Sequence, residues 1–255
     1  MDHLPVRTTG DDQAASRHAD AEVTLFCLPH AGGSAAYYAR FGDHFPPRVA
    51  ARPLELPGRG RRCREPLLTD IDAQSRDLLA QILPAAAGRP YALFGHSMGA
   101  HLAHRCAQLA AERGEPLPLA LFVSSAAAPG RRRTAGPSLP LPLTAAGGWQ
   151  YVIDMGGVPQ CIAESPDFRK YLEPILFADV TAIETWQPPP ATPLPIPITV
   201  FFGSEDLVTG AQAREWGDLT TRGCEVCAFP GDHFYLQDHW SALADRILDA
   251  LGRRR

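Results

Sequence analysis

A serine flanked by glycines is the residue whose setting most directly suggests chemistry. Ser97 lies in GHSMG, residues 95–99, which fits the pattern G-x-S-x-G. The apolar run Tyr91–Phe94 precedes it, and small and apolar residues at helical spacing follow it. This order predicts a sharp strand-to-helix turn that presents the hydroxyl to a substrate, with glycines where a Cβ would collide with neighbouring backbone. The chemistry indicated is acyl transfer or hydrolysis through a covalent serine intermediate.

A serine hydroxyl needs a base to take its proton, and the base must be oriented by a third group. Among nine histidines, His233 lies in a loop between the last apolar strand and the terminal helix, so we predict that it is the base. His239 sits one turn into a helix, where a solvated or packing role is expected. His101 and His104 are expected to face outward from the helix after the serine, and His96 to point beside the pocket.

Two carboxylates follow the apolar run Ile198–Phe202, namely Glu205 and Asp206. The short side chain of Asp206 fits a loop that turns a carboxylate back toward His233, so we predict that it is the acid. Glu205 is the alternative, and a solvated loop charge is its simpler interpretation. Asp232 is expected to hydrogen-bond its own backbone.

An oxyanion hole needs two backbone donors. One is the N–H of Met98, directly after the serine. The loop LPHAGGS, residues 28–34, follows the run Val23–Leu28, and its two glycines let the backbone approach a substrate, so Ala31 supplies the second N–H. Alone, this loop also fits a plain turn or a phosphate cradle. Beside a placed serine, acid and histidine, the oxyanion role is favoured.

The elements that must position these residues alternate along the chain, which predicts an α/β fold with a mostly parallel sheet and helices on both faces. Strands are predicted at Val23–Leu28, Val49–Leu54, Tyr91–Phe94, Leu119–Ser124, Ile198–Phe202 and Glu225–Phe229. Helices are predicted at Ala35–Phe45, Ile71–Ala86, Met98–Arg113, Gln212–Leu219 and Leu236–Leu251. The carboxyl ends of the strands, and with them the site, then lie along one edge.

Residues 137–187 break this rhythm, with helix-like pieces around Trp149–Met155 and Phe168–Ile183. Insertions at this point commonly form a mobile lid over the site. Extra helical packing without a gating role is the alternative.

Length and composition limit the classes to which the protein can belong. The 255 residues suit one α/β domain, over about 21–252, after a flexible leader at 1–20 that lacks a signal peptide. A net charge of −4 argues against a nucleic-acid partner, and no apolar run of about eighteen residues predicts a membrane span. We expect a cytoplasmic protein. Four of the six scattered cysteines, Cys27, Cys106, Cys224 and Cys227, lie in apolar or periodic segments and are expected to pack in the core, since no second pair completes a zinc site.

An ordered series of motifs makes the chain resemble stand-alone type II thioesterases of polyketide and nonribosomal peptide synthetase systems, which have the α/β-hydrolase fold. The motifs are PHAGG at 29–33, LPGRG at 56–60 with EP at 65–66, FGHSMGA at 94–100, GGVP at 156–159, PIL at 174–176 with AD at 178–179, FGSED at 202–206 and GDHF at 231–234. Members usually carry an arginine where Phe177 stands, and often tyrosine and glutamate in place of His104 and Arg105.

The resemblance implies a hydrolase that removes stalled or wrongly loaded acyl groups from the phosphopantetheine arm of acyl or peptidyl carrier domains. It implies a triad of Ser97, Asp206 and His233, and oxyanion amides of Ala31 and Met98. No metal or organic cofactor is implied, and phosphopantetheine enters only as part of the substrate. We expect a monomer. The alternatives are a chain-releasing thioesterase, which hydrolyses or cyclises a finished product, and a non-catalytic protein that docks carrier domains.

Two arginine clusters remain outside these assignments. They are Arg59, Arg61, Arg62 and Arg64, and Arg131, Arg132 and Arg133. Each fits either contact with an acidic carrier domain or its phosphate, or a solvated surface loop. Neither is placed in the active site.

Overall fold

The computed structural model describes residues 21–130, 153, 156–158, 164–190 and 192–253. The expected leader at 1–20, the second arginine cluster at 131–133 and nearly all of the expected helix at Trp149–Met155 lie outside these residues. In the described part of the chain, no helix combines the length and the apolar character that a membrane span requires.

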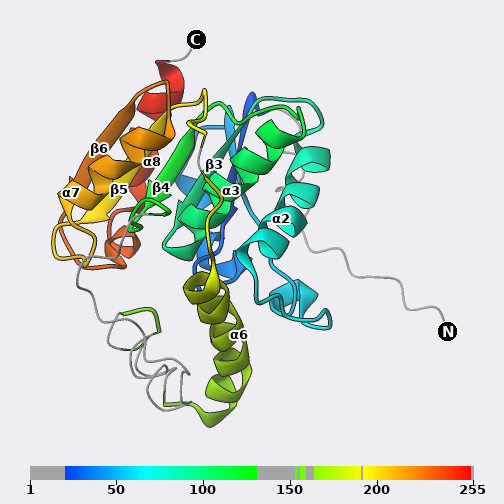
Figure 1. The fold of residues 1–255 in the computed structure, drawn as a ribbon. Helices are drawn as coiled ribbons and strands as arrows, with labels where there is room; N and C mark the ends of the chain where they lie inside the picture. The colour runs from blue at the N-terminus through cyan, green and yellow to red at the C-terminus, as the bar shows by residue number, and fades with distance from the viewer. Residues whose placement is uncertain (1–20, 131–152, 154–155, 159–163, 191, 254–255) are drawn as a thin grey trace.

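Six parallel strands form one sheet in the order β2-β1-β3-β4-β5-β6 (Figure 1). They are β1 (Val23–Leu28), β2 (Val49–Pro53), β3 (Tyr91–His96), β4 (Leu121–Ser124), β5 (Ile198–Gly203) and β6 (Cys224–Phe229). The predicted strands are confirmed, with bounds that differ by two residues at most. Because all six run in the same direction, the loops after β1, β3, β5 and β6 leave the same edge of the sheet.

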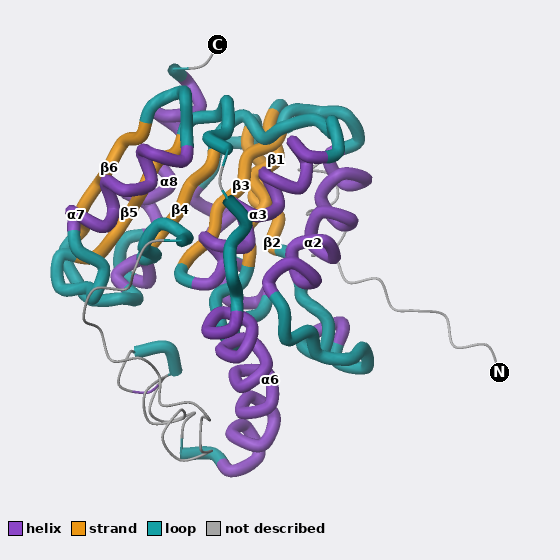
Figure 2. Tube along the Cα trace, viewed as in Figure 1, coloured by secondary structure: helices purple, strands orange, loops and turns teal. Residues whose placement is uncertain are grey.

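Helices cover both faces of the sheet, as predicted (Figure 2). They are α2 (Ile71–Ala86), α3 (Met98–Glu112), α6 (Pro166–Thr185), α7 (Gly210–Arg214) and α8 (Trp240–Gly252). The single helix expected over Ala35–Phe45 is wrong: two 3₁₀ turns stand there, η1 (Ala35–Tyr38) and η2 (Phe41–His44). Tyr38 ends η1 and Phe41 begins η2, and both side chains are buried.

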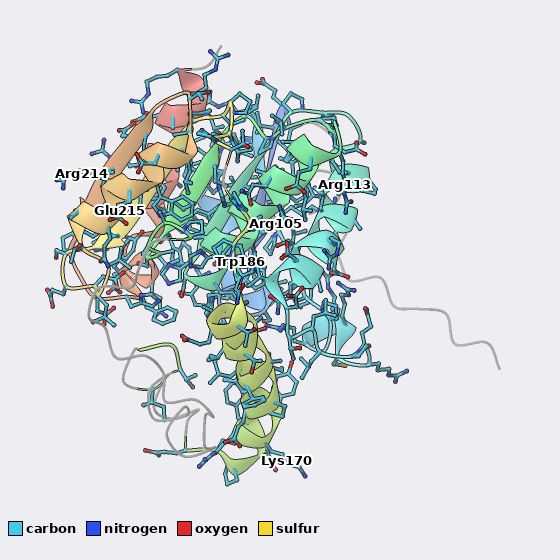
Figure 3. The ribbon with its side chains drawn as sticks, viewed as in Figure 1. Arg105, Arg113, Lys170, Trp186, Arg214 and Glu215 are labelled. Atoms are coloured by element: carbon cyan, nitrogen blue, oxygen red, sulfur yellow. The ribbon has the colours of Figure 1, made fainter. Side chains whose placement is uncertain are left out.

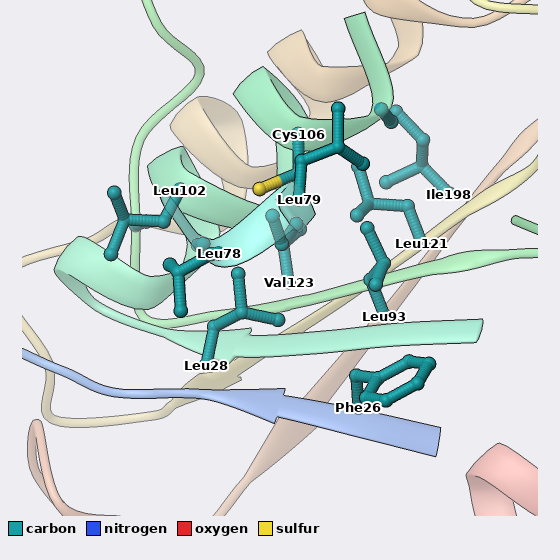
Figure 4. Packing of buried hydrophobic residues seen from close by; sticks show 14 of the residues in the cluster. Phe26, Leu28, Leu78, Leu79, Leu93, Leu102, Cys106, Leu121, Val123 and Ile198 are labelled. Atoms are coloured by element: carbon teal, nitrogen blue, oxygen red, sulfur yellow. The ribbon is translucent and has the colours of Figure 1, made fainter. Parts of the chain in front are cut away.

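The core consists of two apolar layers, one on each face of the sheet. In β1, Phe26 and Leu28 pack toward α2 and α3, whereas Leu25 and Cys27 pack toward α8, as the alternation of a strand requires. Figure 4 shows the first layer, where side chains of α2 and α3 lie over β1, β3 and β4. Cys27 and Cys106 are buried thiols in these layers, as expected.

Helix α3 is more enclosed than its sequence suggests. His104 was expected to face outward, but its exposed fraction is 1% and its ring lies 5.6 Å from that of Trp216. Trp216 belongs to η4 (Glu215–Leu219) and packs against this side of α3. On the other side, Arg105 pairs with Asp72 of α2. The outward orientation of His104 is therefore corrected, because helices on both flanks bury α3.

Burial of His104 predicts a loss of stability in acid. Desolvation lowers its pKa to about 3, and His101 and Arg105 add to the effect. An unfolded histidine titrates near 6.5, so between these values the unfolded chain binds a proton that the folded chain does not. Stability must then fall as pH decreases below about 6.5. We expect His104→Gln to reduce the pH slope of the unfolding free energy by about 1.4 kcal/mol per pH unit between pH 4 and 6, measured by urea denaturation.

The matched control is His44→Gln, because His44 is exposed. It should leave the slope unchanged. An equal slope in wild type and His104→Gln would show that His104 does not remain neutral in the folded protein at acid pH.

Candidate active site

The turn between β3 and α3 holds Ser97 in a strained conformation. Its φ of 53° and ψ of −119° lie in a region that residues other than glycine rarely adopt. Its N–H donates to the carbonyl oxygen of Ser124 at 2.8 Å, which continues the β3–β4 ladder through the turn. The serine therefore stands at the carboxyl end of a central strand, as its motif predicts.

The glycines of the motif are required by backbone crowding. A Cβ on Gly95 would lie 1.9 Å from the carbonyl oxygen of Gly99, and a Cβ on Gly99 would lie 2.5 Å from that of Leu28. The same Cβ would lie 3.0 Å from the carbonyl oxygen of Pro29. The glycine-rich loop after β1 is thus packed directly against the serine turn.

This crowding gives a direct test on stability. Gly95→Ala should lower the free energy of unfolding by more than about 3 kcal/mol, because only backbone surrounds the new methyl group. Gly252→Ala is the control, since nothing lies within 4 Å of the position that its Cβ would take. It should change stability by less than about 0.5 kcal/mol. Equal unfolding midpoints for the two variants would contradict the packing described for the turn.

His233 and Asp206 meet at the same edge. His233 Nδ1 lies 3.0 Å from Asp206 Oδ1, with side-chain exposed fractions of 13% and 0%. Burial raises the pKa of Asp206, but the hydrogen bond to His233 and its charge outweigh that effect, so the pKa is lowered overall. Glu205, the alternative acid, is exposed. Asp232 accepts the N–H of Phe234 at 2.9 Å, the local backbone bond that was predicted.

The loops that carry these two residues are tied together by backbone. A Cβ on Gly203 would lie 2.2 Å from the carbonyl oxygen of Asp232, so only glycine permits this approach. Ser204 N–H donates to Phe229 at 2.7 Å, and Glu205 N–H donates to Gly231 at 2.9 Å. The loops after β5 and β6 therefore hold the carboxylate and the imidazole at a fixed separation.

Sequence reasoning missed Ser125, which touches both loops. It follows β4, is buried, and has a φ of 50°. Its Oγ donates to the carbonyl oxygen of His233 at 3.3 Å, and the same hydroxyl is among the neighbours that lower the pKa of Asp206. The only signal in the sequence was its place after a strand that neighbours β3.

Two further histidines form the wall beside His233. The ring of His96 lies 5.0 Å from that of His233, and the ring of His30 lies 6.0 Å from that of His96. Burial, together with the charges of His233 and Arg59, lowers the pKa of His30 to about 3. Burial also places the pKa of His96 well below its usual value. Both rings are neutral near pH 7, so they add no positive charge beside His233.

The loop at 28–34 packs against the serine turn through the carbonyl oxygens of Leu28 and Pro29 and carries the predicted oxyanion amide of Ala31. Gly32 N–H donates to Asp179 Oδ2 at 2.8 Å, and Gly33 N–H donates to the carbonyl oxygen of His30 at 2.9 Å. These two donors are engaged, whereas no hydrogen bond within the described residues uses the Ala31 N–H. Met98 is the first residue of α3, where an N–H has no acceptor within the helix.

The arginine cluster at 59–64 is not uniformly a surface feature. Arg59 is buried, with an exposed fraction of 1%, and pairs with the fully buried Asp179 through two hydrogen bonds of 2.6 and 2.7 Å. A solvated surface position is therefore wrong for Arg59, whose guanidinium donates to the carbonyl oxygen of Gly33 in the loop at 28–34. Arg61 and Arg64 are exposed, as a solvated loop requires.

Helix α6 lies in the segment expected to form a lid. The helix predicted at Phe168–Ile183 is present as α6, with slightly wider bounds. It projects away from the sheet (Figures 1 and 2). Figure 3 shows Lys170 near its far end and Trp186 where the chain returns to the body. Phe177, which stands where the resembled family usually has arginine, is exposed.

Among the described residues, no group of three His, Cys, Asp or Glu side chains is placed to hold a metal ion.

Comparison with known proteins agrees with this arrangement. A family model for the thioesterase domain matches residues 23–251. The human medium-chain S-acyl fatty acid synthase thioesterase is 32% identical over 238 residues, which cover 92% of this chain and 89% of that protein. The chain therefore belongs to the thioesterase family, whose members are hydrolases that act on thioesters.

Solved structures confirm the expected fold class and the resemblance. ClbQ, from the colibactin nonribosomal peptide and polyketide pathway, superposes with a TM-score of 0.84 at 30% identity, covering 91% of this chain and 98% of that one. BorB, a type II thioesterase from the borrelidin biosynthetic cluster, superposes with a TM-score of 0.80 at 34% identity, covering 90% and 92%. The fold is that of the α/β-hydrolase thioesterases.

Proposed function

We propose that this protein hydrolyses acyl thioesters on the phosphopantetheine arm of carrier domains, through an acyl-enzyme on Ser97. The observation that carries the proposal is the hydrogen-bonded Asp206–His233 pair, which lies at the same sheet edge as the strained serine. An imidazole that is oriented by a carboxylate and can reach a serine hydroxyl is the arrangement that activates a serine nucleophile.

In the first step, His233 Nε2 takes the proton of Ser97 as Oγ bonds to the thioester carbonyl carbon. Asp206 holds the opposite ring nitrogen and stabilises the imidazolium that forms. The amides of Ala31 and Met98 donate to the oxyanion of the tetrahedral intermediate, where one such donor contributes roughly 3–4 kcal/mol. The C–S bond then breaks, and His233 returns its proton to the departing thiolate.

In the second step, water attacks the acyl-serine ester. His233 takes a proton from the water, the oxyanion forms in the same place, and the C–O bond to Ser97 breaks as the serine oxygen is reprotonated. The free acid leaves and the enzyme is restored. These steps use only side chains and amides of this chain, and phosphopantetheine belongs to the substrate.

The carrier-bound substrate and an editing role are supported by the structural relatives. BorB is a type II thioesterase, and ClbQ comes from a synthetase pathway. We also propose that the protein acts in the cytoplasm, as a monomer, on carrier domains. The human relative is named for a fatty acid synthase and medium chains, which favours release of a finished chain as the second candidate.

A panel of acyl-loaded carrier domains of different chain length and branching separates the two roles. Release is measured by intact mass of the carrier, with the same acyl groups as oxygen esters for comparison. Editing predicts release of several short acyl groups at similar kcat/KM. Strong selectivity for one long chain would instead establish chain release, and cleavage of oxygen esters alone would contradict a thioesterase.

A further inference from the structure

A buried ion pair connects α6 to the loop that carries the Ala31 amide. Resting on the proposed function, we propose that Arg59 and Asp179 are positioning residues that hold this loop in its catalytic conformation. Because Asp179 belongs to α6, the position of this helix against the loop sets the rate of the chemical step. Neither side chain is assigned contact with the reacting atoms.

Asp179 is fully hydrogen-bonded at a site without solvent. Its Oδ2 accepts from Arg59 Nη1 at 2.6 Å and from Gly32 N–H at 2.8 Å. Its Oδ1 accepts from Arg59 Nη2 at 2.7 Å and from Gln74 Nε2 at 3.1 Å. Arg59 Nη1 also donates to the carbonyl oxygen of Gly33 at 3.2 Å. The pair thus holds the loop by hydrogen bonds to the N–H of Gly32 and to the carbonyl oxygen of Gly33.

These hydrogen bonds determine the direction in which the Ala31 N–H points. The Ala31 N–H and the His30 carbonyl belong to one planar peptide unit and point in opposite directions. The His30 carbonyl accepts Gly33 N–H, so the peptide unit is held only while Gly33 stays in place. Gly32 has a φ of 72°, where a glycine moves freely without external contacts. Asp179 and Arg59 remove that freedom on both sides of Gly32.

A stabilising role alone does not account for the pair. A buried ion pair recovers little more than its own desolvation cost, and apolar residues of similar size often stabilise as well. Its distinctive property is fixed geometry, because two parallel hydrogen bonds lock a guanidinium to a carboxylate. That geometry is transmitted here to a loop whose amide must meet an oxyanion within a few tenths of an ångström.

The link also makes α6 part of the catalytic apparatus. Leu172 and Leu176 lie on the same helix as Asp179, and a side-chain carbon of each lies 3.4 Å from the position that a Cβ on Gly32 would take. The middle of α6 therefore contacts the loop by apolar packing as well as through the carboxylate. A displacement of this part of the helix would release Gly32 N–H and loosen the oxyanion site.

The test compares Asp179→Asn with Asp77→Asn. Asp77 of α2 forms a partly exposed two-bond pair with Arg62, at 2.6 and 2.8 Å, and none of the hydrogen bonds described for Asp77 joins it to residues 28–34. We expect Asp179→Asn to lower kcat about 10- to 100-fold on an acyl carrier, with KM changed less than twofold, because the amide is misplaced rather than removed. Asp77→Asn should retain kcat within about twofold.

An alkylboronic acid provides the second readout, because it forms a tetrahedral adduct on an activated serine that needs the same oxyanion donors. Its affinity should fall with kcat in Asp179→Asn and stay unchanged in Asp77→Asn, which a general loss of stability would not produce. If Asp179→Asn does not fold, Arg59→Lys carries the same test, since it keeps the charge but loses the paired hydrogen bonds.

A wild-type kcat in Asp179→Asn, or a lower kcat with unchanged boronate affinity, would overturn the positioning role. Failure of the boronate to bind the wild-type protein would instead count against the serine mechanism. The two failures are therefore distinguishable.

Discussion

Replacing Ser97 by alanine is expected to lower kcat for release from an acyl carrier by a factor of about 10⁴ to 10⁶. The variant lacks the oxygen that bonds to the acyl group, so neither His233 nor the oxyanion donors have a covalent step to assist. The fold should remain intact, because alanine is smaller and the N–H bond to Ser124 belongs to the backbone. Release is measured by carrier mass, and stability by urea denaturation.

Ser204→Ala is the matched control. Ser204 also follows a strand of the sheet at the same edge, but it is exposed. Its kcat should stay within about twofold of wild type. Hydrolysis at the wild-type rate in a folded Ser97→Ala variant would remove the serine mechanism altogether.

Asp206→Asn is expected to lower kcat by about 10³ to 10⁴. Asp206 Oδ1 accepts a hydrogen bond from His233 Nδ1 and so leaves Nε2 free to take a proton. An asparagine amide can present an N–H instead, which favours the opposite tautomer, and it no longer stabilises an imidazolium. The loss should appear in kcat, measured under saturating acyl carrier.

Glu205→Gln tests the alternative acid by the same chemical change one residue away. Because Glu205 is exposed, its variant should keep kcat within about twofold. A larger loss in Glu205→Gln than in Asp206→Asn would reverse the assignment of the acid.

Local patterns predicted the sheet and much of the site. Short apolar runs bounded by turn residues located each strand, and the parallel direction placed the loops with Ser97, Asp206 and His233 at one edge. Their roles remain predictions that the variants above test. The helix expected over Ala35–Phe45 failed because the segment forms two separate 3₁₀ turns, in which Ala39 N–H donates to Ala36 and Phe45 N–H donates to Gly42 in place of the longer hydrogen bonds of an α-helix.

What the sequence did not predict depends on pairing between distant segments. Arg59 was expected at the surface because four arginines lie close together in the chain, yet its partner, Asp179, is 120 residues away. His104 was expected outside because nothing near it in the chain shows that η4 covers α3. Ser125 gave no motif, and its contact to His233 spans 108 residues. Such contacts follow from the packing of whole elements rather than from local spacing.

The acyl-enzyme is the central claim, and rapid-quench mass mapping of the peptide that contains Ser97 tests it most directly. The enzyme is mixed with an excess of acyl carrier, quenched in acid over milliseconds to seconds, and digested. We predict that the acyl mass appears on Ser97 as the carrier thiol is released, and decays as free acid forms. Release of thiol and acid together, with no acyl group on Ser97 at any time, would contradict it.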